Sequence, residues 1–191
     1  PPGLSVDRIY LDDVCGPNTS PPTACPQVTT KLIDTLNDIG ASFVTYVGHA
    51  SISRWAHEQA FTVRDIARLQ NGERLPVVLS MSCLDGYWFH PRETSLAEEL
   101  VRAPNRGAVA TFSPTGLGVA DGHDLLQRGF YDALFADGVR TLGPATIGAK
   151  YALFASGQHD DLINTFTIFG DPALRLPVPS TAYVPFAMGA R

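Results

Sequence analysis

Apolar and polar positions along the chain follow two different periods, one typical of strands and the other of helices. Short runs rich in β-branched and aromatic residues, or almost continuously apolar, predict strands over residues 6–14, 43–47, 76–81 and 108–112. Apolar stripes predict helices over residues 26–39 and 121–136, and a capping box that begins at Ser95 predicts one over 95–103. Further helices are predicted over 63–69 and, with Pro144 in its first turn, over 144–155. Because strands that alternate with helices favour right-handed crossovers, we predict an α/β fold with a mostly parallel sheet flanked by helices.

Two of the predicted strands end next to residues with catalytic chemistry. His49 follows the strand over 43–47, and Cys83 follows the strand over 76–81. In such sheets ligands bind outside the carboxyl ends of the strands, so the two side chains would share one rim if their strands are neighbours. An imidazole beside a thiol can stabilise the thiolate or accept the proton as the sulfur attacks. Spacing alone leaves open a hydrogen-bonded turn histidine and an inert core thiol.

Length and charge narrow the classes of function. The chain has 191 residues, of which 45% are hydrophobic, and its net charge is −5. This length suits one compact domain, and the acidic balance argues against a nucleic-acid or anionic-lipid partner. No apolar run approaches the roughly 20 residues of a membrane-spanning helix. Because the chain begins Pro1-Pro2-Gly3 without a methionine, we expect a piece of a longer polypeptide, with residues 177–191 as a proline-containing linker or tail.

The three cysteines differ in their surroundings. Cys15 and Cys25 bracket a loop rich in glycine, proline and other turn-forming residues, which suggests a disulfide and therefore an oxidising compartment. Two unpaired thiols are the alternative. With the disulfide, Cys83 is left as the unpaired cysteine, and the protein is expected to be secreted or on the cell surface.

Three blocks of the sequence resemble the gingipain family of cysteine peptidases, which belongs to the wider group that contains caspases and legumains. Residues 46–51, followed by Trp55, are similar to the family's aromatic-x-Gly-His-Gly-Ser block with its downstream tryptophan. Residues 75–83 resemble the Leu-Pro-led strand that delivers the nucleophile, and residues 168–174 resemble the Phe-Gly-Asp-Pro-Ser-Leu block that ends the catalytic domain. The resemblance implies a three-layer caspase-like domain over residues 1–176, corresponding to the later, catalytic half of a larger peptidase domain.

The resemblance also implies roles for individual residues. Cys83 corresponds to the nucleophile and His49 to the catalytic histidine, and the backbone N–H groups of Ala50 and Cys83 correspond to the oxyanion donors. Ala50 replaces the usual glycine of the block, which would cost about 1 kcal/mol of strain if the turn required a positive φ.

The pocket for the substrate side chain is expected to include Ser113, Pro114, Thr115 and Gly116. In the family, the acidic residue that supports the histidine and the residue that reads a basic substrate side chain both lie in the earlier half of the domain. These positions would precede Pro1, so the substrate preference does not carry over from the resemblance.

The resulting hypothesis is a cysteine endopeptidase that acts on proteins or peptides through an acyl-enzyme, with the upstream half of its own polypeptide as a partner. Two alternatives remain: an inactive caspase-like module that binds or scaffolds a partner, and a sortase-like transpeptidase that uses the same dyad. No cofactor is required and no metal ligands are assigned. Calcium is possible as a structural ion, with Asp12, Asp13 or Asp171 as contributors, although their spacing does not define a site.

Other residues suggest no separate chemistry. His57 and Glu58 lack the second histidine of a zinc-binding HExxH motif and are expected in an exposed loop. His90 and His123 are expected at the surface. His159 precedes two aspartates that suit the start of a helix.

Overall fold

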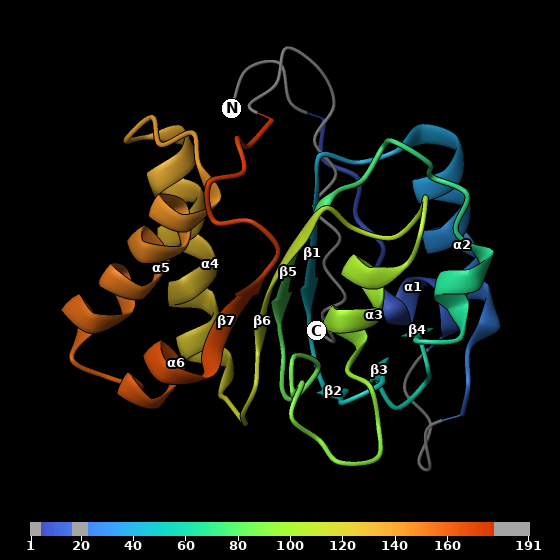
Figure 1. Cartoon of the computed structure of the whole chain (residues 1–191). Coiled ribbons are helices and arrows are strands. Elements are labelled where there is room, and N and C mark those ends of the chain that lie inside the picture. Colours follow the sequence, from blue (N-terminus) through green and yellow to red (C-terminus); the bar gives the residue numbers. More distant parts are fainter. Residues whose placement is uncertain (1–4, 17–22, 178–191) are drawn as a thin grey trace.

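The central sheet of the computed structural model, which describes residues 5–16 and 23–177, contains four strands in the order β1-β5-β6-β7 (Figure 1). β1 (Phe43–Val47), β5 (Val77–Met81) and β6 (Ala110–Pro114) are parallel, and β7 (Phe166–Phe169) runs antiparallel to β6. The predicted strands over 43–47 and 76–81 are confirmed. The fourth predicted strand lies two residues further along the chain than expected, since β6 continues through Pro114 beside β7.

The predicted first strand over residues 6–14 is wrong. Residues 5–10 have no regular secondary structure, and α1 (Leu11–Cys15) follows them. Of the apolar side chains that suggested a strand, Ile9 is fully buried from the irregular segment, Leu11 and Val14 of α1 pack against the same core, and Val6 is exposed. Two aspartates in the first turn of α1 favour a helix at this point, because negative charge is stabilised at a helix N-terminus.

The remaining helices follow the predicted order. They are α2 (Pro26–Asp34), which continues as the π-helical turn η1 (Thr35–Ile39), the 3₁₀ turn η2 (Asp65–Arg68), α3 (Leu96–Arg102), α4 (Ala120–Phe135), α5 (Leu142–Ser156) and α6 (Asp160–Thr165). α3 begins with the capping box that the sequence predicted, in which Ser95 accepts the N–H of Glu98 and the Glu98 carboxylate accepts the N–H of Ser95.

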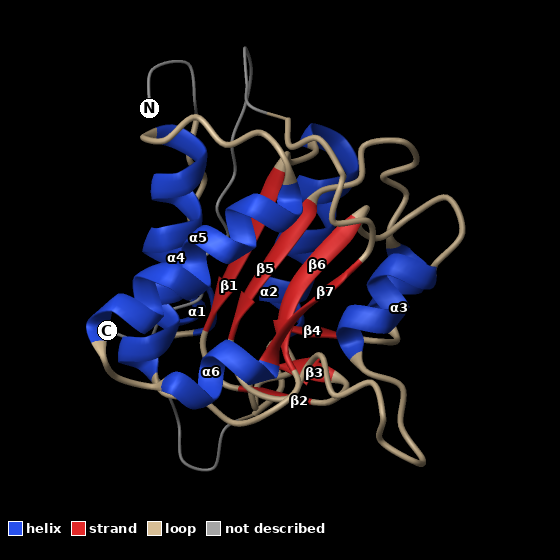
Figure 2. Ribbon diagram, turned by 60° about the vertical axis from the view of Figure 1, so that its left-hand side comes forward, coloured by secondary structure: helices blue, strands red, loops and turns tan. Residues whose placement is uncertain are grey.

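Helices cover both faces of the sheet, which confirms the predicted α/β fold with a mostly parallel sheet between helical layers (Figures 1 and 2). Val44 and Tyr46 of β1 face a core formed with α2 and α3, whereas Phe43 lies in a second core formed with α4, α5 and α6. This alternation arises because successive side chains of a strand point to opposite faces.

A small second sheet was not predicted. It joins β2 (Ala50–Ser51), β3 (Arg54–Trp55) and β4 (Phe61–Thr62), which are antiparallel neighbours. Strands of two residues are too short to show a period in the sequence. This small sheet matters for the site because its first strand, β2, begins directly after His49.

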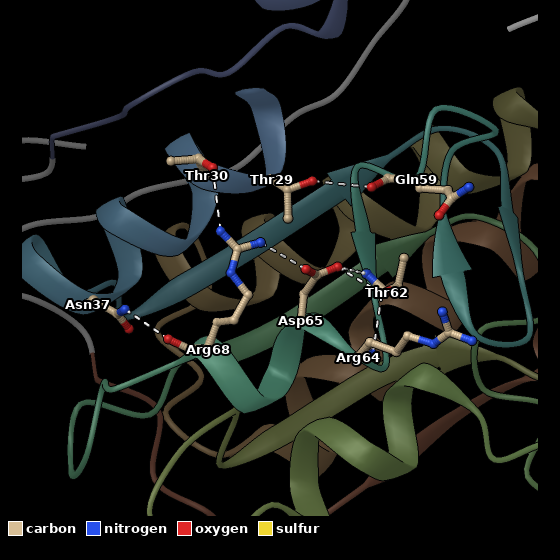
Figure 3. Close-up of polar contacts among 8 residues, drawn as sticks. All are labelled: Thr29, Thr30, Asn37, Gln59, Thr62, Arg64, Asp65 and Arg68. Atoms are coloured by element: carbon tan, nitrogen blue, oxygen red, sulfur yellow. Dashed lines mark hydrogen bonds and ion pairs between the residues drawn. The ribbon is translucent and has the colours of Figure 1, made fainter. Parts of the chain in front are cut away.

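Polar contacts attach α2 to the segment that follows this small sheet (Figure 3). The Asp65 carboxylate accepts hydrogen bonds from the backbone and hydroxyl of Thr62 and pairs with Arg68 at 3.0 Å. Arg68 also reaches the Thr30 hydroxyl, and the Thr29 hydroxyl donates to the Gln59 carbonyl. The loop that carries β3 and β4 is therefore held against the helical layer at several points.

The disulfide between Cys15 and Cys25 is present and joins the end of α1 to the start of α2, with 6.0 Å between the two Cα atoms. None of the helices in the described residues has the length and apolar character to cross a membrane. The predicted tail over 177–191 lies, apart from Pro177, outside the described residues.

α4 and α5 pack closely because small residues face each other. A Cβ atom added at Gly129 of α4 would lie 2.7 Å from the Ala152 Cβ and 2.9 Å from the Ala149 Cα of α5. Such distances leave no room for even one methyl group, so the backbones approach each other only because this position is glycine.

Replacing Gly129 with alanine is expected to lower the free energy of unfolding by about 1–3 kcal/mol, because the new methyl group overlaps α5. This loss would exceed the helix-propensity gain of up to about 1 kcal/mol that alanine brings. Asp124→Ala, at an exposed position of the same helix, serves as the control and should change stability by no more than about 0.5 kcal/mol. Urea denaturation measures both variants. Equal stability of Gly129→Ala and the parent would contradict the close packing.

Candidate active site

The pairing of β1 with β5 determines where the two candidate catalytic residues lie. The parallel register ends with Val47 opposite Met81, and the Gly48 N–H then donates to the Met81 carbonyl at 3.3 Å. His49 and Cys83 each follow the last pair by two residues. Since hydrogen-bonded strands lie about 4.8 Å apart, both residues leave the sheet at the same edge and from adjacent strands.

Cys83 is half-buried and is the free cysteine of the chain. Its sulfur lies 3.7 Å from the Gly118 carbonyl oxygen, in the loop between β6 and α4. Leu84 donates its N–H to the Gly116 carbonyl, and Gly86 donates to the Pro114 carbonyl at 2.9 Å. The segment after Cys83 is thus hydrogen-bonded to the end of β6 and the loop that follows it.

Gly86 allows this close approach. A Cβ atom at this position would lie 3.0 Å from the Pro114 carbonyl oxygen and 3.1 Å from the Ser113 Cβ. Leu84, by contrast, adopts a positive φ of 64°, an unusual conformation for a residue with a Cβ. The turn beside Cys83 therefore contains a strained residue at Leu84 and a space-limited one at Gly86.

The His49 backbone is fixed while its side chain is exposed. The His49 carbonyl accepts hydrogen bonds from the Ala56 N–H at 2.8 Å and from the Tyr46 hydroxyl at 2.5 Å. The exposed His57 ring lies 6.3 Å from the His49 ring, measured between centroids. The imidazole of His49 is thus accessible from solvent, while hydrogen bonds from Ala56 and Tyr46 fix its backbone.

The substitution of Ala50 for glycine does not introduce the strain that was considered from the sequence. Ala50 lies in β2, paired with Trp55, and is not among the described residues with positive φ. Non-glycine residues with positive φ in this region are Ala56, with a value of 58°, and Gln59, with a value of 55°. An extended conformation suits alanine as well as glycine.

Beneath the rim lies a carboxyl group that the sequence analysis missed. Asp85 has a relative exposure of 1%, and its carboxylate accepts the Trp55 Nε1–H at 2.8 Å. Burial raises the pKa of Asp85 to about 7, although the hydrogen bonds from Ser80 and Trp55 act in the opposite direction. The pKa of the buried Tyr46 is raised as well, first by burial and then by the nearby Asp85.

The four residues expected around the substrate pocket fall into two groups. Ser113 and Pro114 are buried in β6, paired with Thr167 and Phe166 of β7. Thr115 and Gly116 are half-buried in the following loop, where the Thr115 hydroxyl donates to the Thr165 carbonyl at the end of α6. Of the four, only these two reach the partly exposed surface near Cys83.

The expectation that His123 lies at the surface is wrong. The side chain is 6% exposed and packs beside Phe166, with 5.7 Å between ring centroids. A Cβ atom at Gly118 would lie 2.3 Å from the His123 Nε2, so the glycine makes room for the ring. Burial, and to a smaller degree the nearby His159, lower the pKa of His123 to about 4.

Metal-binding side chains do not gather anywhere in the described part of the chain in groups of three or more. His57 is exposed as expected, whereas Glu58 is buried at 9% exposure, contrary to the expectation of an exposed loop. The Glu58 carbonyl accepts the Cys25 N–H at 2.8 Å, which holds this loop beside the disulfide. Asp171 caps its own turn by accepting the Ala173 N–H at 2.8 Å.

Comparison with known proteins agrees with this arrangement. The family model for peptidase family C25 matches residues 1–177, which is most of the chain. This chain belongs to peptidase family C25. Among its C25 relatives, Gingipain R2 and Gingipain R1 of Porphyromonas gingivalis are each 28% identical over 172 residues, covering 83% of this chain. The aligned region is 23% of Gingipain R2 and 17% of Gingipain R1, so this chain spans less than a quarter of their length.

Solved structures show the same fold. The crystal structure of the Arg-specific cysteine proteinase gingipain R matches with a TM-score of 0.71 and 26% identity, over 78% of this chain and 36% of that chain. The complex of Porphyromonas gingivalis RgpB pro- and mature domains matches with a TM-score of 0.72 and 26% identity, over 78% and 37% of the two chains. The resemblance noted in the sequence is thereby confirmed as C25 membership and as a gingipain-like fold.

The buried His123 should make stability depend on pH in a defined direction. Its folded pKa is about 4, against 6.5 for the ordinary side chain, so between these values the unfolded chain binds a proton that the folded chain does not. Stability is therefore lost as pH falls from 6.5 towards 4, by up to about 3 kcal/mol.

His123→Gln is expected to remove that part of the pH dependence, as measured by thermal unfolding at pH 4, 5, 6 and 7. His90→Gln, in a half-exposed loop, is the matched control and should retain the parent's profile. If both variants keep the parent's slope between pH 4 and 6.5, His123 is not the group responsible.

Proposed function

We propose that this chain provides the catalytic dyad of a secreted or cell-surface cysteine endopeptidase, with Cys83 as nucleophile and His49 as general base and acid. One observation carries the proposal. In a chain of family C25, the only free cysteine and an exposed histidine follow the paired ends of neighbouring parallel strands by the same two residues. The likeness to gingipain R, an Arg-specific cysteine proteinase, supports the same reaction class.

The reaction follows from these groups. The Cys83 sulfur, after losing its proton to His49, attacks the carbonyl carbon of the scissile peptide. The C–N bond breaks as the His49 imidazolium gives its proton to the leaving amine, and a thioester with Cys83 remains. Water then loses a proton to His49 and attacks the thioester, which releases the carboxylic acid product and returns the thiol.

Backbone N–H groups of Ala50 and Cys83 would stabilise the oxyanion. The geometry at Ala50 supports this role. Because the Ala56 N–H donates to the His49 carbonyl, Ala50 and Trp55 form a non-hydrogen-bonded pair of the small antiparallel sheet. In such a pair the N–H groups point away from the partner strand, which leaves that of Ala50 available to a ligand.

We further propose that the dyad works within a larger domain, in an oxidising compartment, on a protein or peptide substrate. A preceding part of the same polypeptide would complete the domain and provide the acidic support for His49, since this chain spans about a third of the gingipain R chain. A complex of pro- and mature domains is known for RgpB. The disulfide favours an oxidising compartment. Thr115 and Gly116 would line the pocket for a protein or peptide substrate, and no cofactor takes part, with calcium at most a structural ion.

The test uses the full polypeptide that carries this chain. Iodoacetamide should label Cys83 faster than a free thiol at neutral pH, and peptide hydrolysis should vanish in Cys83→Ala. His49→Ala is expected to lower kcat by about 10²–10⁴-fold, because it removes the proton acceptor. Rates of labelling across pH and rates of peptide hydrolysis are the two measurements.

His57→Ala provides the matched control, because His57 is an exposed histidine beside His49. Its kcat should stay within about threefold of the parent's. If His49→Ala changes neither labelling nor hydrolysis, the dyad is wrong. Loss of activity in His57→Ala alone would assign the role of base to His57. Transfer of the acyl group to an added amine in preference to water would make the enzyme a transpeptidase.

A further inference from the structure

Asp85 lies at the junction of three elements beneath the rim. It follows Cys83 by two residues, its backbone carbonyl accepts the Ala97 N–H of α3 at 2.9 Å, and its side chain is almost completely buried. One carboxylate oxygen, Oδ2, accepts hydrogen bonds from Trp55 Nε1 and from the Ser80 hydroxyl. The other oxygen, Oδ1, has no hydrogen-bond partner among the described residues. A buried carboxyl with a bare oxygen is costly for folding.

From Trp55 the contacts continue to His49. The Trp55 ring is 2% exposed and stacks on Tyr46, with centroids 4.5 Å apart and planes 7° from parallel. The Tyr46 hydroxyl in turn donates to the His49 carbonyl. A single path of direct contacts therefore runs from the residue beside the nucleophile to the backbone of the histidine.

Strained residues flank both ends of the Trp55–Asp85 hydrogen bond. Leu84, immediately before Asp85, has a φ of 64°, and Ala56, immediately after Trp55, has a φ of 58°. Non-glycine residues keep such conformations only where the surroundings enforce them. The hydrogen bond joins the two strained turns, one behind Cys83 and the other behind His49.

We propose that Asp85 is a positioning residue, which holds the turn after Cys83 and the loop after His49 in one packed unit through its hydrogen bond to Trp55. The inference rests on the proposed function, since it concerns the same dyad. The positioning role explains why a buried carboxyl, which destabilises the fold, occupies a place where an apolar side chain would be more stable. Asp85 touches no reacting atom in this role, so it acts through the position of the other two residues.

The expected signature is a loss of kcat with little change in KM. A displacement of the dyad by about 1 Å can cost on the order of 100-fold in rate. We therefore expect Asp85→Leu and Trp55→Phe each to lower kcat by roughly 10- to 100-fold while KM stays within about threefold. Asp85→Asn retains an oxygen acceptor for Trp55 and should keep kcat within about threefold of the parent's.

The double variant Asp85→Leu/Trp55→Phe separates positioning from simple stability. It removes both partners of the bond, and the Ser80 hydroxyl, which loses Asp85 as its acceptor, still has the Ser82 hydroxyl at 2.9 Å. With neither the Trp55 donor nor the carboxylate left unpaired, the fold should be nearly as stable as the parent. Its kcat should nevertheless stay as low as that of either single variant, because the two changes break the same link. Urea denaturation measures stability, and steady-state peptide hydrolysis measures kcat and KM.

A spectroscopic measurement is available because the chain has two tryptophans, Trp55 and Trp88. In a Trp88→Phe background, the emission of Trp55 should shift in Asp85→Leu and keep its position in Asp85→Asn. Parent-like kcat in Asp85→Leu, or low kcat in Asp85→Asn at parent-like stability, would overturn the positioning role while leaving the dyad intact. Slow labelling of Cys83 in the parent would instead refute the proposed function, and the positioning role with it.

Discussion

The parallel pairing of β1 with β5 is the constraint on which the candidate site depends. Side chains of a strand alternate between faces, so a shift of this register by one residue would move His49 or Cys83 to a different face and depth. The register is held because both faces of these strands are buried. Val44 and Val78 enter one core, whereas Phe43 and Val77 enter the other. The hydrophobic packing that stabilises the fold thus also sets the relative position of Cys83, the proposed nucleophile, and His49, the proposed base.

The buried polar residues of this sheet show where the fold accepts an energetic cost. Thr45 bonds the Tyr131 hydroxyl at 2.6 Å on one face, and on the other face the Ser80 and Ser82 hydroxyls lie 2.9 Å apart, beside Asp85. Buried hydroxyls that satisfy one another cost little, whereas a carboxyl with a bare oxygen costs more. The polar side of β5 lies under the rim that carries Cys83, so the costly groups are concentrated next to the candidate site.

Sequence reasoning could predict the elements whose burial leaves a clear pattern. β1 and β5 are short apolar runs buried almost throughout, α4 has an apolar stripe, and the positions of His49 and Cys83 follow from where β1 and β5 end. The segment over 6–14 was misassigned because spaced apolar residues look alike whether a strand or an irregular segment buries them. The resemblance to the gingipain family, rather than the pattern of apolar positions, linked His49 and Cys83 to one reaction.

Other features were beyond sequence reasoning because they depend on segments far apart in the chain. The His123 ring is buried beside Phe166, which comes much later in the sequence, and Gly118 leaves room for the ring. Asp85 looks like an ordinary turn residue between Leu84 and Gly86. Its role depends on Trp55, which is 30 residues earlier.

The distribution of strain explains how alanine can occupy position 50 of the Gly-His block. The conformations that favour glycine are found at Leu84 and Ala56, not at Ala50, which lies in the extended strand β2. Each αL residue with a Cβ costs of order 1–3 kcal/mol, and both are adjacent to the Trp55–Asp85 hydrogen bond. Local backbone preference alone would favour glycine or asparagine at either position. Because leucine and alanine stand there, tertiary contacts such as the buried bond, and not local backbone preference, determine the shape of both turns.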